Sequence, residues 1–495
     1  MNGIMKHART AIAIGIMASA VCYSSESAAE PPGEVEQSAT YPIRVFYDAS
    51  LVDFVPQVMS DTEDAWQTVI VDQGLVPPLH MVGDVAEVGF DVVLDISISG
   101  LAQYEIAGVD ATTPATDCAV LNTFNPMGAA TLDYIRMTVE LLVARSSLRA
   151  VDCIEPVKPA YDMFGVAFGV LSMGDLNPYW LSSELPSFQA LPWNSLDYAG
   201  GSSATEIFYP YGSALFTLFI DEAYGEGDGS FIVETWNGTA QDGTIESFSG
   251  LSCTADVENE PDYLDAIGSQ LESVGASFDE AMVEFAQWRY FIGADDDGAH
   301  FANAASWAGG EVALDTVLTV DDLPVDGQTC ENPVAELGTG YIEVDLEGLG
   351  APEEPLEVSF EAVTEGSSWS AVAYFIPSEG GEATIQPLAF TDADHGSLML
   401  PELASYAVMI LAVVNLGDGD HDGDAMDWST ANGEFRFSIG PHVDDLEDAG
   451  VDAGADAGDD AGSGASSDDG CACSAAVGGE PRRGSLLAVM LGIAG

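Results

Sequence analysis

The chain has 495 residues, enough for two or three domains with cores, and its 47% hydrophobic content excludes a wholly disordered protein. It carries 82 Asp and Glu against 11 Lys and Arg, a formal net charge of −71. Such a surface repels nucleic acid and anionic membranes, so we expect neither as a partner. The carboxylates run through the whole chain, and molar salt screens their repulsion over about 3 Å. The composition therefore indicates a protein adapted to a saline environment.

The first residues predict an exported protein. Lys6 and Arg9 precede the apolar run AIAIGIMASAV, and small residues follow at SAA, the pattern of a secretory signal peptide over residues 1–29. Val21 before Cys22 does not fit a lipoprotein motif, so we expect no lipid anchor there. Because export permits disulfides, the four cysteines of the folded region are candidates for disulfide bonds. Chain order suggests Cys118–Cys153 and Cys253–Cys330, although four cysteines allow three pairings.

After a polar linker at residues 30–40, we predict an α+β domain over residues 41–310. YPIRVFY begins it as a strand, Leu51 to Gln73 is predicted as a helix, and FDVVLDISI is predicted as a buried strand. Long helices follow at 131–149, 161–172, 209–225 and 277–293. The last begins with Ser277 and Glu280 at capping-box spacing. Strands first and long helices afterwards favour an α+β fold.

Residues 333–442 predict an antiparallel β-sandwich, because short β-rich runs alternate there with Gly, Pro, Asp and Glu. The runs are YIEVDL, LEVSFEAV, SAVAYFIP, ATIQPLAF, YAVMILAVVNL and EFRFSI. YAVMILAVV is too short to cross a bilayer, so we predict a central strand and no internal transmembrane helix.

The C-terminal residues predict a tail outside any core. Residues 443–470 contain DAGVDAGADAGDDAG, an acidic repeat that predicts a disordered spacer. Residues 471–495 resemble the C-terminal sorting signal found in myxobacteria, with Cys471 and Cys473 followed by an apolar segment. The resemblance implies processing near Cys471 by a sorting machinery and display on the cell surface. The alternative is an apolar terminus without a sorting role.

The sequence offers no local zinc motif. The closest two of its six histidines, His421 and His442, stand 21 residues apart, whereas helix-borne zinc ligands stand one turn apart. A GxSxG nucleophile elbow is also absent.

Three segments carry a resemblance: RVFYDASL, YPYGSALFTLFIDEAYG and FAQWRYFIGADDDGAHF. In this order they are similar to a family of secreted predicted metalloproteases of myxobacteria and their relatives. The resemblance implies that TLDYIRMTVELLVARSSL occupies the place of the HExxH helix. Glu140 then matches the general base, while Val139 and Val143 stand where the zinc-ligand histidines would be. The third ligand, a Glu, would fall at Phe164, so the resemblance implies a degenerate site, and we do not expect zinc.

Glu140 also has a simpler interpretation. At about 100° per residue, Asp133, Arg136, Glu140 and Ser147 form a narrow polar stripe. An exposed ion pair between Arg136 and Glu140 would contribute roughly 0.2–0.5 kcal/mol. We therefore expect a solvated stripe, with a relic catalytic base as the alternative.

One acidic segment has the character of a metal site. GDGDHDGDAMDW places Asp418, Asp420, Asp422 and Asp424 as in the first half of a calcium loop. The position of the final Glu is Ser429, so a solvated acidic loop is the alternative to calcium. GADDDGAH, at residues 293–300, is a weaker candidate.

Together these features predict an exported, surface-displayed, non-catalytic protein with a metalloprotease-like scaffold. It would bind an unknown protein, peptide or envelope component, for instance by strand addition beside FDVVLDISI. The alternative is a secreted zinc metallopeptidase with a rearranged metal site, which would require His80 or His300 to converge on Glu140.

Overall fold

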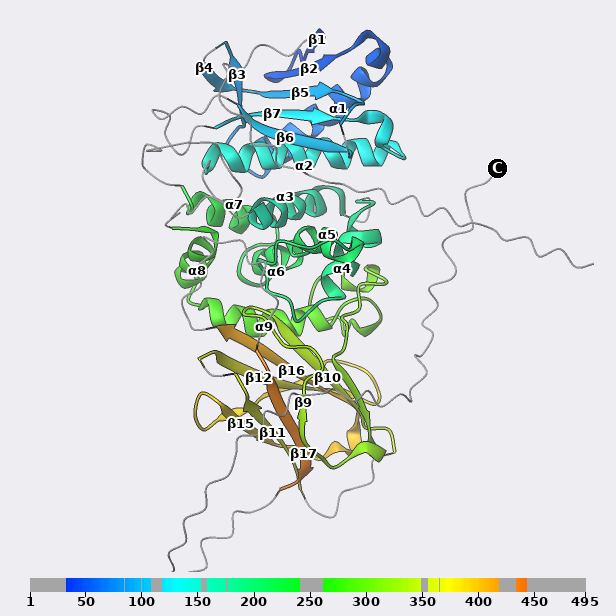
Figure 1. Cartoon of the computed structure of the whole chain (residues 1–495), viewed down its shortest axis with the longest axis vertical. Coiled ribbons are helices and arrows are strands. Elements are labelled where there is room, and N and C mark those ends of the chain that lie inside the picture. The colour runs from blue at the N-terminus through cyan, green and yellow to red at the C-terminus, as the bar shows by residue number, and fades with distance from the viewer. Residues whose placement is uncertain are drawn as a thin grey trace, which may run out of the picture. The chain divides into compact units, whose positions relative to one another are not determined.

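A computed structural model gives the fold. It describes residues 33–83, 85–98, 100–107, 118–152, 158–174, 177–240, 261–348, 355–364, 366–417 and 433–442, all within one compact unit. The fold mixes helices and sheets, as the sequence predicts (Figure 1). The predicted signal peptide, acidic spacer and sorting cysteines lie outside the described residues, as do Cys153, Cys253 and the predicted calcium ligands Asp418, Asp420, Asp422 and Asp424.

The N-terminal part contains a seven-stranded sheet in the order β1-β2-β5-β7-β3-β4, with β6 paired to β7. The four inner strands β2, β5, β7 and β3 pair in parallel with one another. Strands β1, β4 and β6 pair antiparallel with β2, β3 and β7. The bounds are β1 Glu34–Gln37, β2 Ile43–Tyr47, β3 Leu79–Val82, β4 Val85–Val88, β5 Phe90–Leu94, β6 Ala102–Ala107 and β7 Ala119–Phe124.

The position of β5 corrects one prediction. This strand is the buried strand predicted in FDVVLDISI, and β2 and β7 pair with its two sides (Figure 1). A strand cannot add beside it, because both rows of its backbone hydrogen bonds are taken. The segment predicted as a linker also contains a strand, β1, whose four side chains are all exposed and which therefore lacks a hydrophobic signal.

Most predicted helices are present. The helix expected at 51–73 consists of a 3₁₀ turn (η1, Ala49–Phe54), α1 (Val55–Ala65) and a π-helical end (η2, Trp66–Asp72). The helix expected at 209–225 is divided into two at Ser213. The other bounds are α2 Leu132–Val151, α3 Lys158–Met173, η5 Trp180–Glu184, α4 Leu185–Gln189, α5 Ala204–Gly212, α6 Ala214–Tyr224, α7 Ser230–Asn237, α8 Tyr263–Ser273 and α9 Phe278–Tyr290. The predicted capping box of α9 is confirmed, with Ser277 and Glu280 bonded reciprocally.

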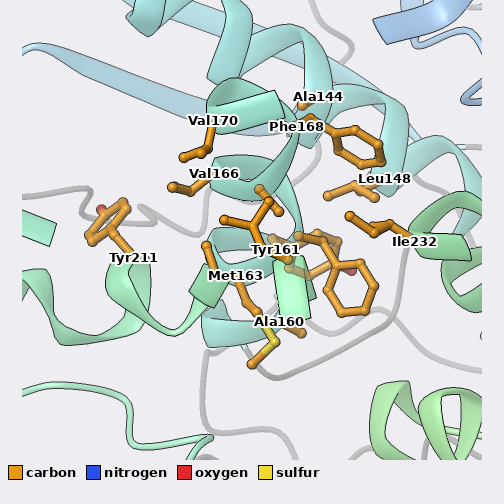
Figure 2. Packing of buried hydrophobic residues seen from close by; sticks show 14 of the residues in the cluster. Ala144, Leu148, Ala160, Tyr161, Met163, Val166, Phe168, Val170, Tyr211 and Ile232 are labelled. Atoms are coloured by element: carbon orange, nitrogen blue, oxygen red, sulfur yellow. The ribbon is translucent and has the colours of Figure 1, made fainter. Parts of the chain in front are cut away.

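One hydrophobic core unites the sheet with these helices. Figure 2 shows side chains of several helices within it, among them Leu148 of α2, Phe168 of α3 and Ile232 of α7. Helix α2 packs against α1, α3 and strand β7, so it has neighbours on several sides. This enclosure decides the environment of Glu140.

The C-terminal part consists of two five-stranded sheets, β13-β12-β16-β10-β8 and β14-β15-β11-β17-β9. Side chains from both sheets, such as Leu411 and Phe437, share one core, which is the arrangement of a β-sandwich. β16 is flanked by β12 and β10, as predicted, but β8 and β10 pair in parallel. The bounds are β8 Thr316–Thr319, β9 Val325–Thr329, β10 Thr339–Asp345, β11 Leu356–Ala362, β12 Ser368–Pro377, β13 Thr384–Pro387, β14 Ala389–Phe390, β15 His395–Met399, β16 Tyr406–Gly417 and β17 Phe435–Pro441. Within the described ranges, no helix has the length and apolarity needed to span a membrane.

The structure contradicts one of the two suggested cysteine pairs. Cys330 is a buried free thiol, so the pair Cys253–Cys330 is wrong. Burial raises the pKa of this thiol to about 11, which keeps it protonated and unreactive. Cys118 takes part in a disulfide, and its partner lies outside the described residues.

Candidate functional site

Helix α2 carries Glu140 in its middle, and the surrounding elements bury it. Fifteen of the 20 residues of this helix are buried, and Glu140 is 2% exposed. Ser147 is fully buried and donates a hydrogen bond to the carbonyl oxygen of Val76. The prediction of a solvated polar stripe is therefore wrong for Glu140 and Ser147, which face neighbouring elements, whereas Asp133 at the start of the stripe is exposed and Arg136 is half-buried.

The hydrogen-bond partner of Glu140 is on the next helix. Ser172 of α3 donates a hydrogen bond to Oε1 of Glu140. Burial raises the pKa of the Glu140 carboxyl to about 8; the charge of Arg136 opposes the shift, and those of Asp61 and Asp64 add to it. Glu140 is therefore mainly protonated at neutral pH. In this state it cannot accept a proton as a general base.

The positions of the expected zinc ligands belong to the hydrophobic core. Val139, Val143 and Phe164 are each 0% exposed. The Phe164 ring packs against Trp236 of α7, with ring centroids 4.9 Å apart. Zinc requires nitrogen, sulfur or oxygen donors, which none of these three side chains has. The residues present therefore do not fit a zinc ion at this place.

The four histidines within the described residues have other partners. His80 Nδ1 lies 2.7 Å from Asp91, whose carboxylate also accepts hydrogen bonds from Arg44. His300 Nδ1 lies 2.7 Å from Asp297. In the sandwich, His395 and His442 pair with Asp392 and Glu357. Within the described ranges, no three His, Cys, Asp or Glu side chains are grouped so that they could hold a metal ion.

A small pocket lies beside α2, on the side of η5 and α5. Its volume is about 30 Å³, roughly the space of one or two water molecules. Its walls are mainly apolar and aromatic, and Leu141 and Phe208 are only half-buried. The lining residues are Leu101, Ala102, Met137, Thr138, Leu141, Leu142, Arg145, Tyr179, Glu184, Phe208 and Tyr211.

Arg145 and Glu184 are two ionisable side chains among the lining residues of this pocket. Arg145 forms a buried ion pair with Asp162 of α3, and its guanidinium lies 5.5 Å from the ring centres of both Tyr104 and Tyr211. Glu184 is 5% exposed, and burial raises the pKa of its carboxyl to about 8. The charge of Arg145 opposes this rise, and the charge of Asp162 adds to it. Neither Glu184 Oε2 nor Arg145 Nε has a hydrogen-bond partner among the described residues.

A glycine lets Glu184 approach the pocket. A Cβ atom at Gly212, the last residue of α5, would clash with the carbonyl oxygen of Glu184. The absence of a side chain there therefore allows α5 and η5 to lie in direct backbone contact. No sequence motif marks Glu184, because a lone Glu in an acidic chain carries no signal. The segment YPYG, which contains Gly212, enters the sequence analysis only through the family resemblance.

Comparisons with known proteins give no family for the chain. No family model matches it, and no curated protein matches it. Among solved structures it is similar to Legionella pneumophila aminopeptidase A in complex with aspartic acid, with 12% identity and a TM-score of 0.30. The match covers 74% of this chain and 36% of that chain. A TM-score this low carries no argument about fold or activity, so the resemblance to secreted metalloproteases stays a prediction.

Proposed function

We propose that this is a non-catalytic protein that keeps a metalloprotease-like scaffold and acts by binding. The observation that carries the proposal is the filling of the expected zinc positions by Val139, Val143 and Phe164, all fully buried. A metallopeptidase needs two or three metal ligands and an open coordination position. At this place the chain has close-packed hydrocarbon.

The state of Glu140 supports the same proposal. A general base must be ionised and within hydrogen-bond reach of a water or substrate. Glu140 is bonded to Ser172, is almost fully buried and has a pKa of about 8. Its neutral carboxyl serves the contact between α2 and α3.

We further propose that the protein is exported and displayed on the cell surface, where it binds a protein, peptide or envelope component. The signal-peptide pattern and the sorting-type tail support this location, and the net charge of −71 argues against polyanionic partners. Protease treatment of intact cells tests it: loss of the protein supports display, and full protection contradicts it.

A peptidase assay tests the non-catalytic role against the alternative of a rearranged zinc site. Purified full-length protein is incubated with a mixed peptide library, with added zinc and after chelation. The matched variants are Glu140→Gln and, as an exposed control on α8, Glu272→Gln. We expect the same background hydrolysis from all three proteins. Zinc-dependent cleavage that Glu140→Gln abolishes and Glu272→Gln retains would contradict the proposal.

A further inference from the structure

The two edges of the N-terminal sheet differ in their side chains. Strand β1 ends the row on one side and β4 on the other, and within the described residues no further strand pairs with either (Figure 1). The exposed side chains of β1 include Glu34 and Glu36. Charged side chains on an edge strand discourage pairing with another chain. Strand β4 instead exposes Val85 and Val88, at 57% and 52%.

The apolar surface of β4 continues onto β3. Val82 of β3 stands opposite Val85 and is 41% exposed. In the described part of the chain, no other stretch of equal length has as many exposed large apolar side chains as residues 76–88. β-branched side chains also favour an extended backbone. This hairpin therefore keeps an apolar edge within a strongly acidic chain.

The backbone of β4 has hydrogen-bonding groups that face away from β3. In an antiparallel ladder, successive residues point their N–H and C=O groups to alternate sides. Gly89 N donates to Pro78 O, so the odd-numbered residues of β4 face β3. The N–H and C=O groups of Ala86 and Val88 therefore face outward. These four groups are available to an added strand.

We propose that β4 binds an extended segment of a partner protein by antiparallel strand addition, with apolar side chains beside Val85 and Val88 and a basic side chain opposite Glu87. Glu87 is exposed and lies on the same face of the strand as Val85. Opposite charges on facing residues of two strands attract. The net charge of −71 also favours a basic segment. This inference rests on the proposed binding role and names the class of partner.

A second copy of this chain fits the edge less well. In a two-fold antiparallel pair of β4 strands, facing residues lie on the same face of the sheet, so Glu87 would stand opposite Val85 or Glu87 of the second copy. The first pairing sets a carboxylate against an apolar side chain, and the second sets two carboxylates together. Both copies would also carry a net charge of −71. The charges therefore favour a basic segment of another protein.

Two peptides test this chemistry. The Lys peptide is acetyl-Thr-Ile-Lys-Thr-Val-Thr-amide, in which Lys faces Glu87 when Ile and Val face Val88 and Val85; the Glu peptide has Glu in place of Lys. Binding to the full-length protein is measured by saturation-transfer NMR in about 0.5 M salt, where screening over about 4 Å suppresses long-range attraction to the acidic surface. We expect the Lys peptide to bind about three- to fivefold more tightly. Equal binding, or no binding of the Lys peptide at millimolar concentrations, would overturn the proposal.

A charge reversal locates the binding on β4. In Glu87→Lys we expect the preference to invert, so that the Glu peptide binds more tightly than the Lys peptide. Glu272→Lys, on the exposed face of α8, changes the net charge equally and should keep the wild-type preference. An unchanged preference in Glu87→Lys, or an inversion in Glu272→Lys, would show that the peptides bind elsewhere and would contradict the proposal.

Proline substitutions test the backbone hydrogen bonds. Val88→Pro removes an outward N–H without breaking the ladder to β3. Ser38 N donates to Ile43 O, so the N–H of Val35 on β1 also faces outward, and Val35→Pro is the matched control. We expect Val88→Pro to weaken binding of the Lys peptide at least about fivefold and Val35→Pro to leave it unchanged. Equal effects would contradict strand addition at β4. If urea unfolding shows that Val88→Pro is destabilised, Glu87→Lys decides.

Light scattering on the protein without peptide tests the second copy. We expect the wild type and Val88→Pro to have the same molar mass at every salt concentration. A dimer that Val88→Pro dissociates and Val35→Pro retains would show that β4 pairs with itself, and would overturn the basic partner segment. Failure of strand addition in these tests leaves the non-catalytic role standing, because the peptidase assay tests that role separately.

Discussion

Replacement of Glu140 by Gln should remove a specific part of the pH dependence of stability. The pKa of this carboxyl is 4.5 in an unperturbed chain and about 8 in the folded protein. Between these values the folded state holds a proton that the unfolded state has lost. Because the folded state binds more protons, the free energy of unfolding falls as pH rises through this window and is highest below the unfolded pKa.

The size of the effect follows from the same shift. One pKa unit corresponds to about 1.4 kcal/mol, so the window from 4.5 to about 8 corresponds to up to about 5 kcal/mol. Gln has no titratable proton and can still accept the hydrogen bond from Ser172. The variant should therefore lose less stability than the wild type as pH rises, with a difference in slope of about 1.4 kcal/mol per pH unit.

Urea unfolding followed by tryptophan fluorescence, at a series of pH values across this window, measures the difference. Comparison with the wild type cancels the repulsion among the many surface carboxylates, which both proteins share. Glu272→Gln, at an exposed site, should follow the wild-type curve. Parallel pH curves for the wild type and Glu140→Gln would refute the assignment of Glu140 as a buried, protonated carboxyl.

Three further predictions concern packing and buried charge. Phe164→Ala should lower the free energy of unfolding by about 3–5 kcal/mol in urea titrations because it leaves a cavity against Trp236, and a loss below about 1 kcal/mol would contradict the core position. Arg145→Met removes the ion-pair partner of buried Asp162 and should lower the free energy of unfolding by about 3–5 kcal/mol. Addition of Asp162→Asn should restore much of this loss. Equal stability of the single and the double variant would argue against the ion pair. Cys330 should resist iodoacetamide in the folded protein and react fully in urea, as peptide mass spectrometry can measure, and fast native labelling would contradict its burial.

Local sequence patterns predicted the elements whose signals are local. The capping box at Ser277 begins α9, and the runs of β-branched and aromatic residues become β10, β11, β12, β16 and β17. β1 was missed because its EVEQ sequence has no hydrophobic alternation and gains its place by pairing with β2.

The environment of the candidate site could not be predicted in the same way. The periodicity of α2 suggested a solvated stripe for Glu140, but packing by distant elements buries it. The pocket brings Glu184 close to Arg145, about 40 residues earlier in the chain, through contacts that no motif encodes. The expected zinc positions Val139 and Val143 came from the resemblance to secreted metalloproteases, which stays a prediction, and not from a pattern in the residues themselves.

The zinc content of the purified full-length protein tests the proposed absence of a zinc site. After equilibration with zinc and removal of the free ion, elemental analysis gives the number of zinc ions per chain. Because Val139, Val143 and Phe164 offer no donor atoms, we expect no stoichiometric zinc, and the same result for Glu140→Gln. One zinc ion per chain in the wild type, lost in Glu140→Gln, would contradict it.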